Sequence, residues 1–198
     1  MLHDSWDGLV CVMCKIERGV YMSALKRYNS SMVVLHWLLA VFILGALFLG
    51  AVVLDEMKNT EPQKMLLLQL HMAGGMLILL LTLLRLVLRL RTPLPAPAAA
   101  PQPWMGTLAT AVHYLLYLLT VVTALAGLTL ALSAKLNEIV FQHIGSLPED
   151  FEGYTAHEVH GVFADLLLAT IVLHVLAALY HQFVLKDGLL SRMSLRRE

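Results

Sequence analysis

The chain has 198 residues, of which 59% are hydrophobic and 14% are charged, and its mean hydropathy is +0.73. Soluble domains carry about 25% charged residues, so this composition excludes a water-soluble globular protein. Fourteen basic residues balance fourteen acidic ones and two cysteines occur, which excludes a nucleic-acid-binding protein and a disulfide-rich secreted scaffold. We therefore expect an integral membrane protein that contacts lipid, with room for about four helical spans of ~20 residues.

Four long apolar runs predict an all-α fold, an integral membrane four-helix bundle. The runs place the spans at about 32–54, 65–90, 108–132 and 160–185. The connections at 55–64, 92–103 and 133–158 are polar or rich in proline, and each is predicted to be a loop. The predicted organisation is an N-terminal segment at 1–31, one transmembrane domain at 32–190 and a basic tail at 191–198.

Lysine and arginine concentrate on one side of this bundle. The first and third connections hold three lysines against eight acidic residues, a net charge of −5 when histidine is neutral. Basic residues favour the cytoplasmic side of a membrane, so both termini are predicted to be cytoplasmic. Eleven of the fourteen basic residues lie on that side: Lys15, Arg18, Lys26, Arg27, Arg85, Arg89, Arg91, Lys186, Arg192, Arg196 and Arg197.

The first 21 residues precede Met22, which looks like an ordinary start followed by a basic lead into the first span. Two interpretations stay open for this segment: an unstructured extension, or an upstream misread of the start. Cys11 and Cys14 have a spacing that suits redox or metal chemistry. No histidine follows them for a c-type haem and no second cysteine pair closes a zinc site, so their role stays unassigned.

Nine histidines occur in this apolar chain, and six fall in or at the edges of the spans. Histidine is costly in hydrocarbon, so an intramembrane histidine indicates a functional site or a hydrogen bond to a neighbouring helix. Six in four helices exceed what helix packing alone explains. They are His36, His71, His113, His160, His174 and His181.

Helical geometry sorts four of these histidines into two levels. His160 and His174 are fourteen residues apart, which places them within about 40° in azimuth and ~21 Å apart along one helix. His36 lies near the basic end of the first span, and His71 follows the acidic first connection. His36 can therefore meet His174 at an inner level, and His71 can meet His160 at an outer level.

Two histidines on facing helices are how a protein holds a six-coordinate haem iron, which carries electrons and has no open position for oxygen. The pattern predicts an inner haem on His36 and His174 and an outer haem on His71 and His160. A porphyrin needs a slot between helices, which small residues open. A small residue follows each ligand by four positions: Ala40, Gly75, Ala164 and Ala178.

Arg85 lies fourteen residues after His71, on the same face of the second span but at the inner level. A guanidinium can pair with a propionate of the inner haem through two parallel hydrogen bonds. The alternative is an arginine that reaches to the cytoplasmic headgroups, and for Arg89 and Arg91 we prefer that interpretation.

Several motifs accompany these residues: Leu35-His36-Trp37, Gln69-Leu-His71 with Gly74-Gly75, Leu84-Arg85-Leu-Val-Leu-Arg89, His113 with Tyr117, and His160, His174 and His181-Gln-Phe-Val-Leu-Lys186-Asp187. With them, the chain from Ser23 to its C-terminus resembles the bacterial cytochrome b561 family of four-helix, di-haem membrane proteins. The first 21 residues have no counterpart in the family.

The resemblance implies two b-type haems, electron exchange with membrane quinone such as ubiquinone, and a multi-pass location in the bacterial inner membrane. His113 and His181 match recurring positions of the family on the cytoplasmic side. They are candidates for a quinone head-group or proton-relay site near the inner haem, with helix-packing hydrogen bonds as the alternative.

Some family members oxidise superoxide at the outer face and reduce ubiquinone. The outer connections of this chain carry a net charge of −5, which repels an anion, so we expect a cationic or protein electron donor instead. Two other function classes stay open. One is a cytochrome b anchor subunit for a dehydrogenase or hydrogenase, and the other is a metal or proton transporter using His157, Glu158, His160, His174 and His181.

Overall fold

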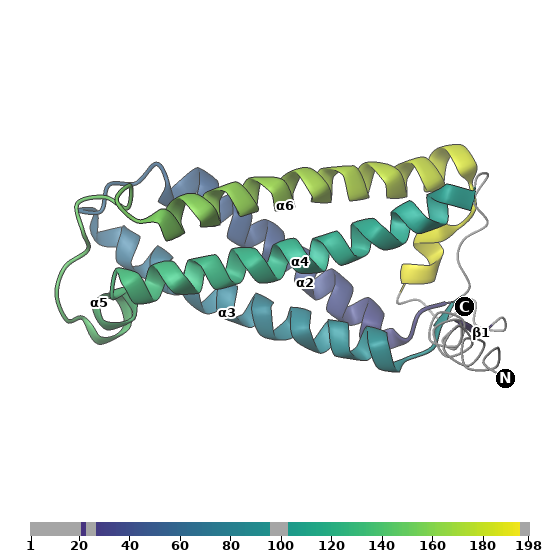
Figure 1. Ribbon diagram of the computed structural model, residues 1–198, viewed down its shortest axis with the longest axis horizontal. Helices are drawn as coiled ribbons and strands as arrows, with labels where there is room; N and C mark the ends of the chain where they lie inside the picture. Colours follow the sequence, from purple (N-terminus) through teal and green to yellow (C-terminus); the bar gives the residue numbers. More distant parts are fainter. Residues whose placement is uncertain (1–20, 23–26, 96–102, 195–198) are drawn as a thin grey trace, which may run out of the picture.

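The computed structural model describes residues 21–22, 27–95 and 103–194, and Figure 1 shows their arrangement. The interpretations of residues 1–20, which include Cys11 and Cys14, lie outside this part of the chain. Four helices are long and apolar enough to cross a membrane: Ser30–Leu54, Pro62–Arg91, Trp104–Ser133 and Thr155–Leu185. The predicted all-α, four-helix membrane fold is confirmed.

The helices that build these spans are α2 (Ser30–Phe48), continued by the π-helical η1 (Leu49–Leu54), α3 (Pro62–Arg91), α4 (Pro103–Ser133), and α6 (Thr155–Tyr180), continued by the π-helical η2 (His181–Leu185). Asn29 caps α2, because its side chain accepts a hydrogen bond of 3.0 Å from the Ser31 amide. Pro62 opens α3 in the first helical turn, where its missing N–H costs nothing.

Shorter elements join the spans. They are the helix α5 (Leu136–Gln142), the 3-10 helix η3 (Leu189–Met193), and the two-residue strands β1 (Tyr21–Met22) and β2 (Leu94–Pro95), which pair in parallel. All four spanning helices begin before the apolar runs do, because a helix extends beyond the hydrocarbon layer into the polar interface.

The third connection differs from the predicted loop. It contains α5 and the first turn of α6, so His157 belongs to a helix. Leu136, Ile139 and Val140 of α5 are buried against the end of the bundle, and the Val140 carbonyl accepts a hydrogen bond of 2.6 Å from the Gln69 side chain. Seven residues are too few for a helical period to stand out in the sequence.

The four spanning helices contact one another to different extents. α4 and α6 run side by side along their length, while α2 packs on α3 and α3 on α4 (Figure 1). A cluster of buried apolar side chains closes the end of the bundle beneath α5: Leu54, Leu68, Ala131, Ala134, Leu136, Ile139 and Val140. Many other large apolar side chains point outward, as a lipid-facing surface requires.

Two hydrogen bonds join the beginning and the end of the described chain. The Tyr28 amide donates to the Arg192 carbonyl at 3.4 Å, and the Trp37 indole N–H donates to the Met193 carbonyl at 2.9 Å. The start of α2 and the segment η3 therefore lie at one end of the bundle, called the inner end below. α5 and the connection after it lie at the opposite, outer end (Figure 1).

We predict that the inner end faces the cytoplasm, because most basic residues of the described part of the chain lie there. In a chain whose two cysteines are replaced by serine, Ser146→Cys at the outer end should react with a membrane-impermeant maleimide in intact spheroplasts. Pro93→Cys at the inner end should react only after permeabilisation. Both positions are exposed, so the label reports the side of the membrane and not burial. The reverse labelling pattern would invert the orientation.

Candidate functional site

The same spacing of fourteen residues recurs on all four spanning helices and divides the bundle interior into two layers. Such a spacing keeps two residues on one face and separates them by about 21 Å. The inner layer consists of His36, Arg85, His113 and His174, and the outer layer consists of Gly50, His71, Gly127 and His160. Each helix contributes one residue to each layer.

In the outer layer, the structure brings His71 and His160 together. Their ring centroids are 6.0 Å apart and their planes are inclined by 81°. The His160 Nδ1–H donates a hydrogen bond of 2.8 Å to the Thr123 carbonyl, which leaves Nε2 as the free nitrogen. His71 Nδ1 is buried without a hydrogen-bond partner among the described residues. Both rings thus keep coordinating capacity that the protein itself does not use.

Two glycines leave room for these rings. A Cβ on Gly50 would lie 3.2 Å from His71 Cε1, and a Cβ on Gly127 would lie 2.9 Å from His160 Cε1. The His160 ring is held by Thr123, so an added methyl group at Gly127 would force it from its position. Overpacking of this kind costs about 1–3 kcal/mol in a well-packed interior. Glycine is therefore required at position 127 for the observed placement of the His160 ring.

A cavity of about 1400 Å³ opens beside the outer pair and is lined by both rings. Gly75 and Ala164, two of the small residues that follow the predicted ligands, also line it, and the space beside Gly75 is open. Ordinary small-molecule sites have volumes of about 300–1,000 Å³, so this cavity has room for a group as large as a porphyrin.

In the inner layer, His36 and His174 form the second pair. Their ring centroids are 6.3 Å apart and their planes are inclined by 71°. Arg85 is buried beside them, with one guanidinium nitrogen 3.5 Å from His36 Nδ1 and another donating a hydrogen bond of 2.6 Å to the Tyr117 hydroxyl. Its Nε atom has no acceptor in the described part of the chain. Arg85 therefore retains donor capacity next to the inner pair.

The separations of the two pairs fit a metal-bound group. With metal–nitrogen bonds of about 2 Å, two imidazoles on opposite sides of one metal have ring centroids about 6 Å apart. The pairs at 6.0 and 6.3 Å meet this condition. The ring centroid of His113 lies 5.3 Å from that of His174, which is shorter than the separation within either pair. The His113 Nδ1–H donates a hydrogen bond to the Ala109 carbonyl of its own helix. His113 thus packs against a pair member.

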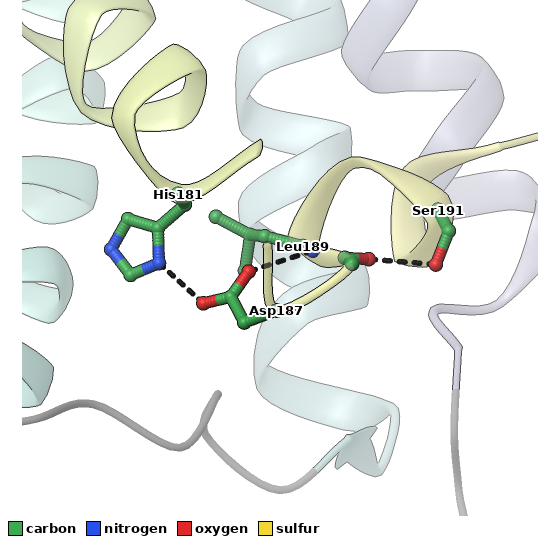
Figure 2. A network of polar contacts seen from close by, with 5 residues as sticks. His181, Asp187, Leu189 and Ser191 are labelled. Atoms are coloured by element: carbon green, nitrogen blue, oxygen red, sulfur yellow. Dashed lines mark hydrogen bonds and ion pairs between the residues drawn. The ribbon is translucent and has the colours of Figure 1, made fainter. Parts of the chain in front are cut away.

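His181 lies beyond the inner layer, where η2 begins. Its Nδ1–H donates to Asp187 Oδ2 at 2.5 Å, and the other carboxylate oxygen accepts from the Leu189 amide at 3.0 Å (Figure 2). Burial alone would raise the pKa of Asp187, but these two hydrogen bonds outweigh it and lower that pKa below its usual value. The carboxylate stays ionised at neutral pH and fixes the His181 tautomer with Nε2 free.

Figure 2 also shows how the turn after η2 is held in place. The Ser191 hydroxyl donates to the Gly188 carbonyl at 2.6 Å, and Gly188 has a positive φ of 70°. Glycine adopts this conformation without strain, which lets the chain reverse between η2 and η3. The reversal brings Asp187 back onto His181.

The other residues singled out from the sequence lie outside the contacts described above. The Arg89 guanidinium lies over the Tyr114 ring, 5.6 Å from its centroid, whereas Arg91 is exposed. Ala40 and Ala178 are half-buried. Over residues 27–95 and 103–194, no group of three or more His, Cys, Asp or Glu side chains is arranged to hold a metal ion.

Sequence reasoning missed Gly50, Thr123 and Gly127, and it gave Asp187 no role beyond its place in a motif. A signal for the two glycines was present, since Gly50 follows His36 by fourteen residues and Gly127 follows His113 by fourteen. The carbonyl of Thr123 and the carboxylate of Asp187 act through backbone geometry that no residue spacing encodes.

Comparison with known proteins identifies the family of the chain. The family model described as prokaryotic cytochrome b561 matches residues 27–194. The chain is also 29% identical over 173 residues to a Yersinia pestis protein named "Probable superoxide oxidase CybB", an alignment that covers 85% of this chain and 96% of that protein. The chain therefore belongs to the prokaryotic cytochrome b561 family, and is a multi-pass bacterial membrane protein that carries electrons through b-type haem.

Proposed function

We propose that the chain transfers electrons across the bacterial inner membrane, from an outer-side donor to the quinone pool, as a quinone-linked oxidoreductase with two haems b. The observation that carries this proposal is the pair of histidine contacts at two levels, with ring centroids 6.3 and 6.0 Å apart. A bis-histidine haem b supplies one-electron transfer and has no open coordination position. His36 and His174 would hold the inner haem, and His71 and His160 the outer one.

The protein groups around each pair support this assignment. The Thr123 carbonyl orients His160 for coordination through Nε2. If His36 coordinated through Nε2, its Nδ1 would carry the proton. Nδ1 could then no longer accept a hydrogen bond from Arg85. The buried guanidinium would be available for a propionate of the inner haem, the role that its place on α3 predicts.

We place the quinone head group at the inner end, near His113 and His181. The Asp187 carboxylate holds Nδ1–H of His181, so Nε2 is the atom that can exchange a proton with a reduced or oxidised quinone. Asp187 is a positioning residue in this scheme. His113 lies in the inner layer, with its ring centroid 5.3 Å from that of His174.

A second candidate donor comes from the relative in Yersinia pestis, whose name specifies superoxide. The net charge of −5 on the outer connections opposes this candidate, because an acidic surface slows the approach of an anion. A cationic or protein donor fits the outer end better. A cytochrome b anchor subunit would use the same histidine pairs, but it would copurify with a stably bound partner protein.

The purified protein should contain two haems b per chain. His71→Ala and His36→Ala should each reduce this ratio to one, because each removes an axial ligand from a different pair. His143→Ala is the matched control, since His143 is exposed at the outer end. Pyridine haemochrome absorbance against protein concentration measures the ratio. Absence of reduced-minus-oxidised haem b bands would refute the proposal.

Electron donation should depend on ionic strength in a direction set by the donor's charge. Electrostatic steering changes association rates by about 10- to 1,000-fold, so haem reduction by a small basic redox protein should slow markedly as salt is added. Stopped-flow spectroscopy measures the rate. If superoxide reduces the haem near the diffusion limit at low ionic strength, the preference for a cationic donor is wrong.

Asp187→Asn should slow quinone reduction. The lowered pKa keeps Asp187 ionised at neutral pH, and its carboxylate accepts the hydrogen bond from His181 Nδ1 that leaves Nε2 free. An amide oxygen is a weaker acceptor than a carboxylate, so the His181 ring should be held less firmly and the rate should fall. Asp150→Asn at the outer end is the control. An unchanged rate with normal haem content would remove Asp187 from the scheme.

A further inference from the structure

Lys64 is a buried cation that the proposed function does not use. Its side chain is only 4% exposed, and its ammonium donates a hydrogen bond to the Met57 carbonyl. An ammonium has three donors, so two of them lack a described acceptor. Asp55 and Glu61 act on it electrostatically, but within the described residues no carboxylate reaches ion-pair distance of it. A buried charge without an anionic partner is costly.

The position of Lys64 relates it to the outer pair. It precedes His71 by seven residues on α3, which places the two within about 20° in azimuth and ~10 Å apart along the helix. Both residues line the same cavity, together with His160. Lys64 therefore lies toward the outer end of the cavity that both rings line.

We propose that Lys64 binds a propionate carboxylate of the outer haem. The assignment rests on the proposed function, because it requires a haem on His71 and His160. A haem propionate is an anion that must be neutralised when it enters a largely apolar cavity, and Lys64 is a buried cation on the ligand's own helix face. The cavity is also lined by carboxylates, which makes a cation beside the propionate the more necessary: Asp55, Glu149, Asp150, Glu152 and Asp165. A lysine suits this role as a point charge that needs no planar partner geometry.

Lys58 provides a matched control within the same cavity. It also lines the cavity and carries the same charge, but its side chain is exposed. Water and salt screen an exposed charge, so Lys58 contributes little to the electrostatic potential at the haem. Burial is the property that separates the two lysines.

The test is a spectroelectrochemical titration of Lys64→Gln in the haem-loaded protein. The substitution is made both in the otherwise unchanged chain and in the His36→Ala variant, which should retain only the outer haem. Each protein is titrated beside its counterpart that keeps Lys64. Reduced haem carries one more negative charge than oxidised haem, so loss of the nearby cation should shift the outer midpoint potential to a lower value. The inner potential should stay constant, and more haem should be lost on gel filtration. Lys64→Arg should restore both properties.

Two outcomes would overturn the assignment alone. One is an unchanged outer potential in Lys64→Gln with haem bound, which would leave Lys64 as a support for the 55–61 loop. The other is an equal shift in Lys58→Gln, which would indicate the general field of the outer face. A protein without haem would instead overturn the proposed function together with this assignment.

Discussion

The structure depends on one geometric constraint: each of the four spanning helices must present two residues to the bundle interior at the same pair of depths. Fourteen residues satisfy this condition, because they span nearly four turns and return to almost the same face. The span formed by α2 and η1 carries a histidine at the inner depth and a glycine at the outer one, as does α4, while α6 carries a histidine at both. A one-residue insertion within any span would rotate one layer against the other.

The two histidine pairs have different surroundings. Around His71 and His160, the backbone at Gly50 and Gly127 approaches the rings closely, and at Gly127 an added Cβ would displace the His160 ring. Around His36 and His174, the neighbours are large and polar, with Arg85 and Tyr117 hydrogen-bonded at 2.6 Å. The outer site is therefore defined by the absence of side chains, and the inner site by a buried charge and its partners.

Much of this arrangement is accessible from the sequence, for a physical reason. Membrane-spanning segments are recognised from the length and hydropathy of apolar runs. A histidine within such a run stands out because burying it in hydrocarbon is energetically costly. A glycine in an apolar helix has no such signature, so Gly50 and Gly127 stand out only once the fourteen-residue spacing is sought on every helix. The π-helical turns at η1 and η2 and the short α5 depend on how the helix ends pack, which a local pattern does not encode.

One feature of the topology bears on assembly. Of the four described spanning helices, α6 is made last, and it supplies one histidine to each pair, His160 at the outer level and His174 at the inner one. A nascent chain that ends before α6 presents His36 and His71 without their partners. Neither proposed bis-histidine site has both of its ligands until α6 is made, so the proposed haems would gain their second ligand only after the first three spans are translated.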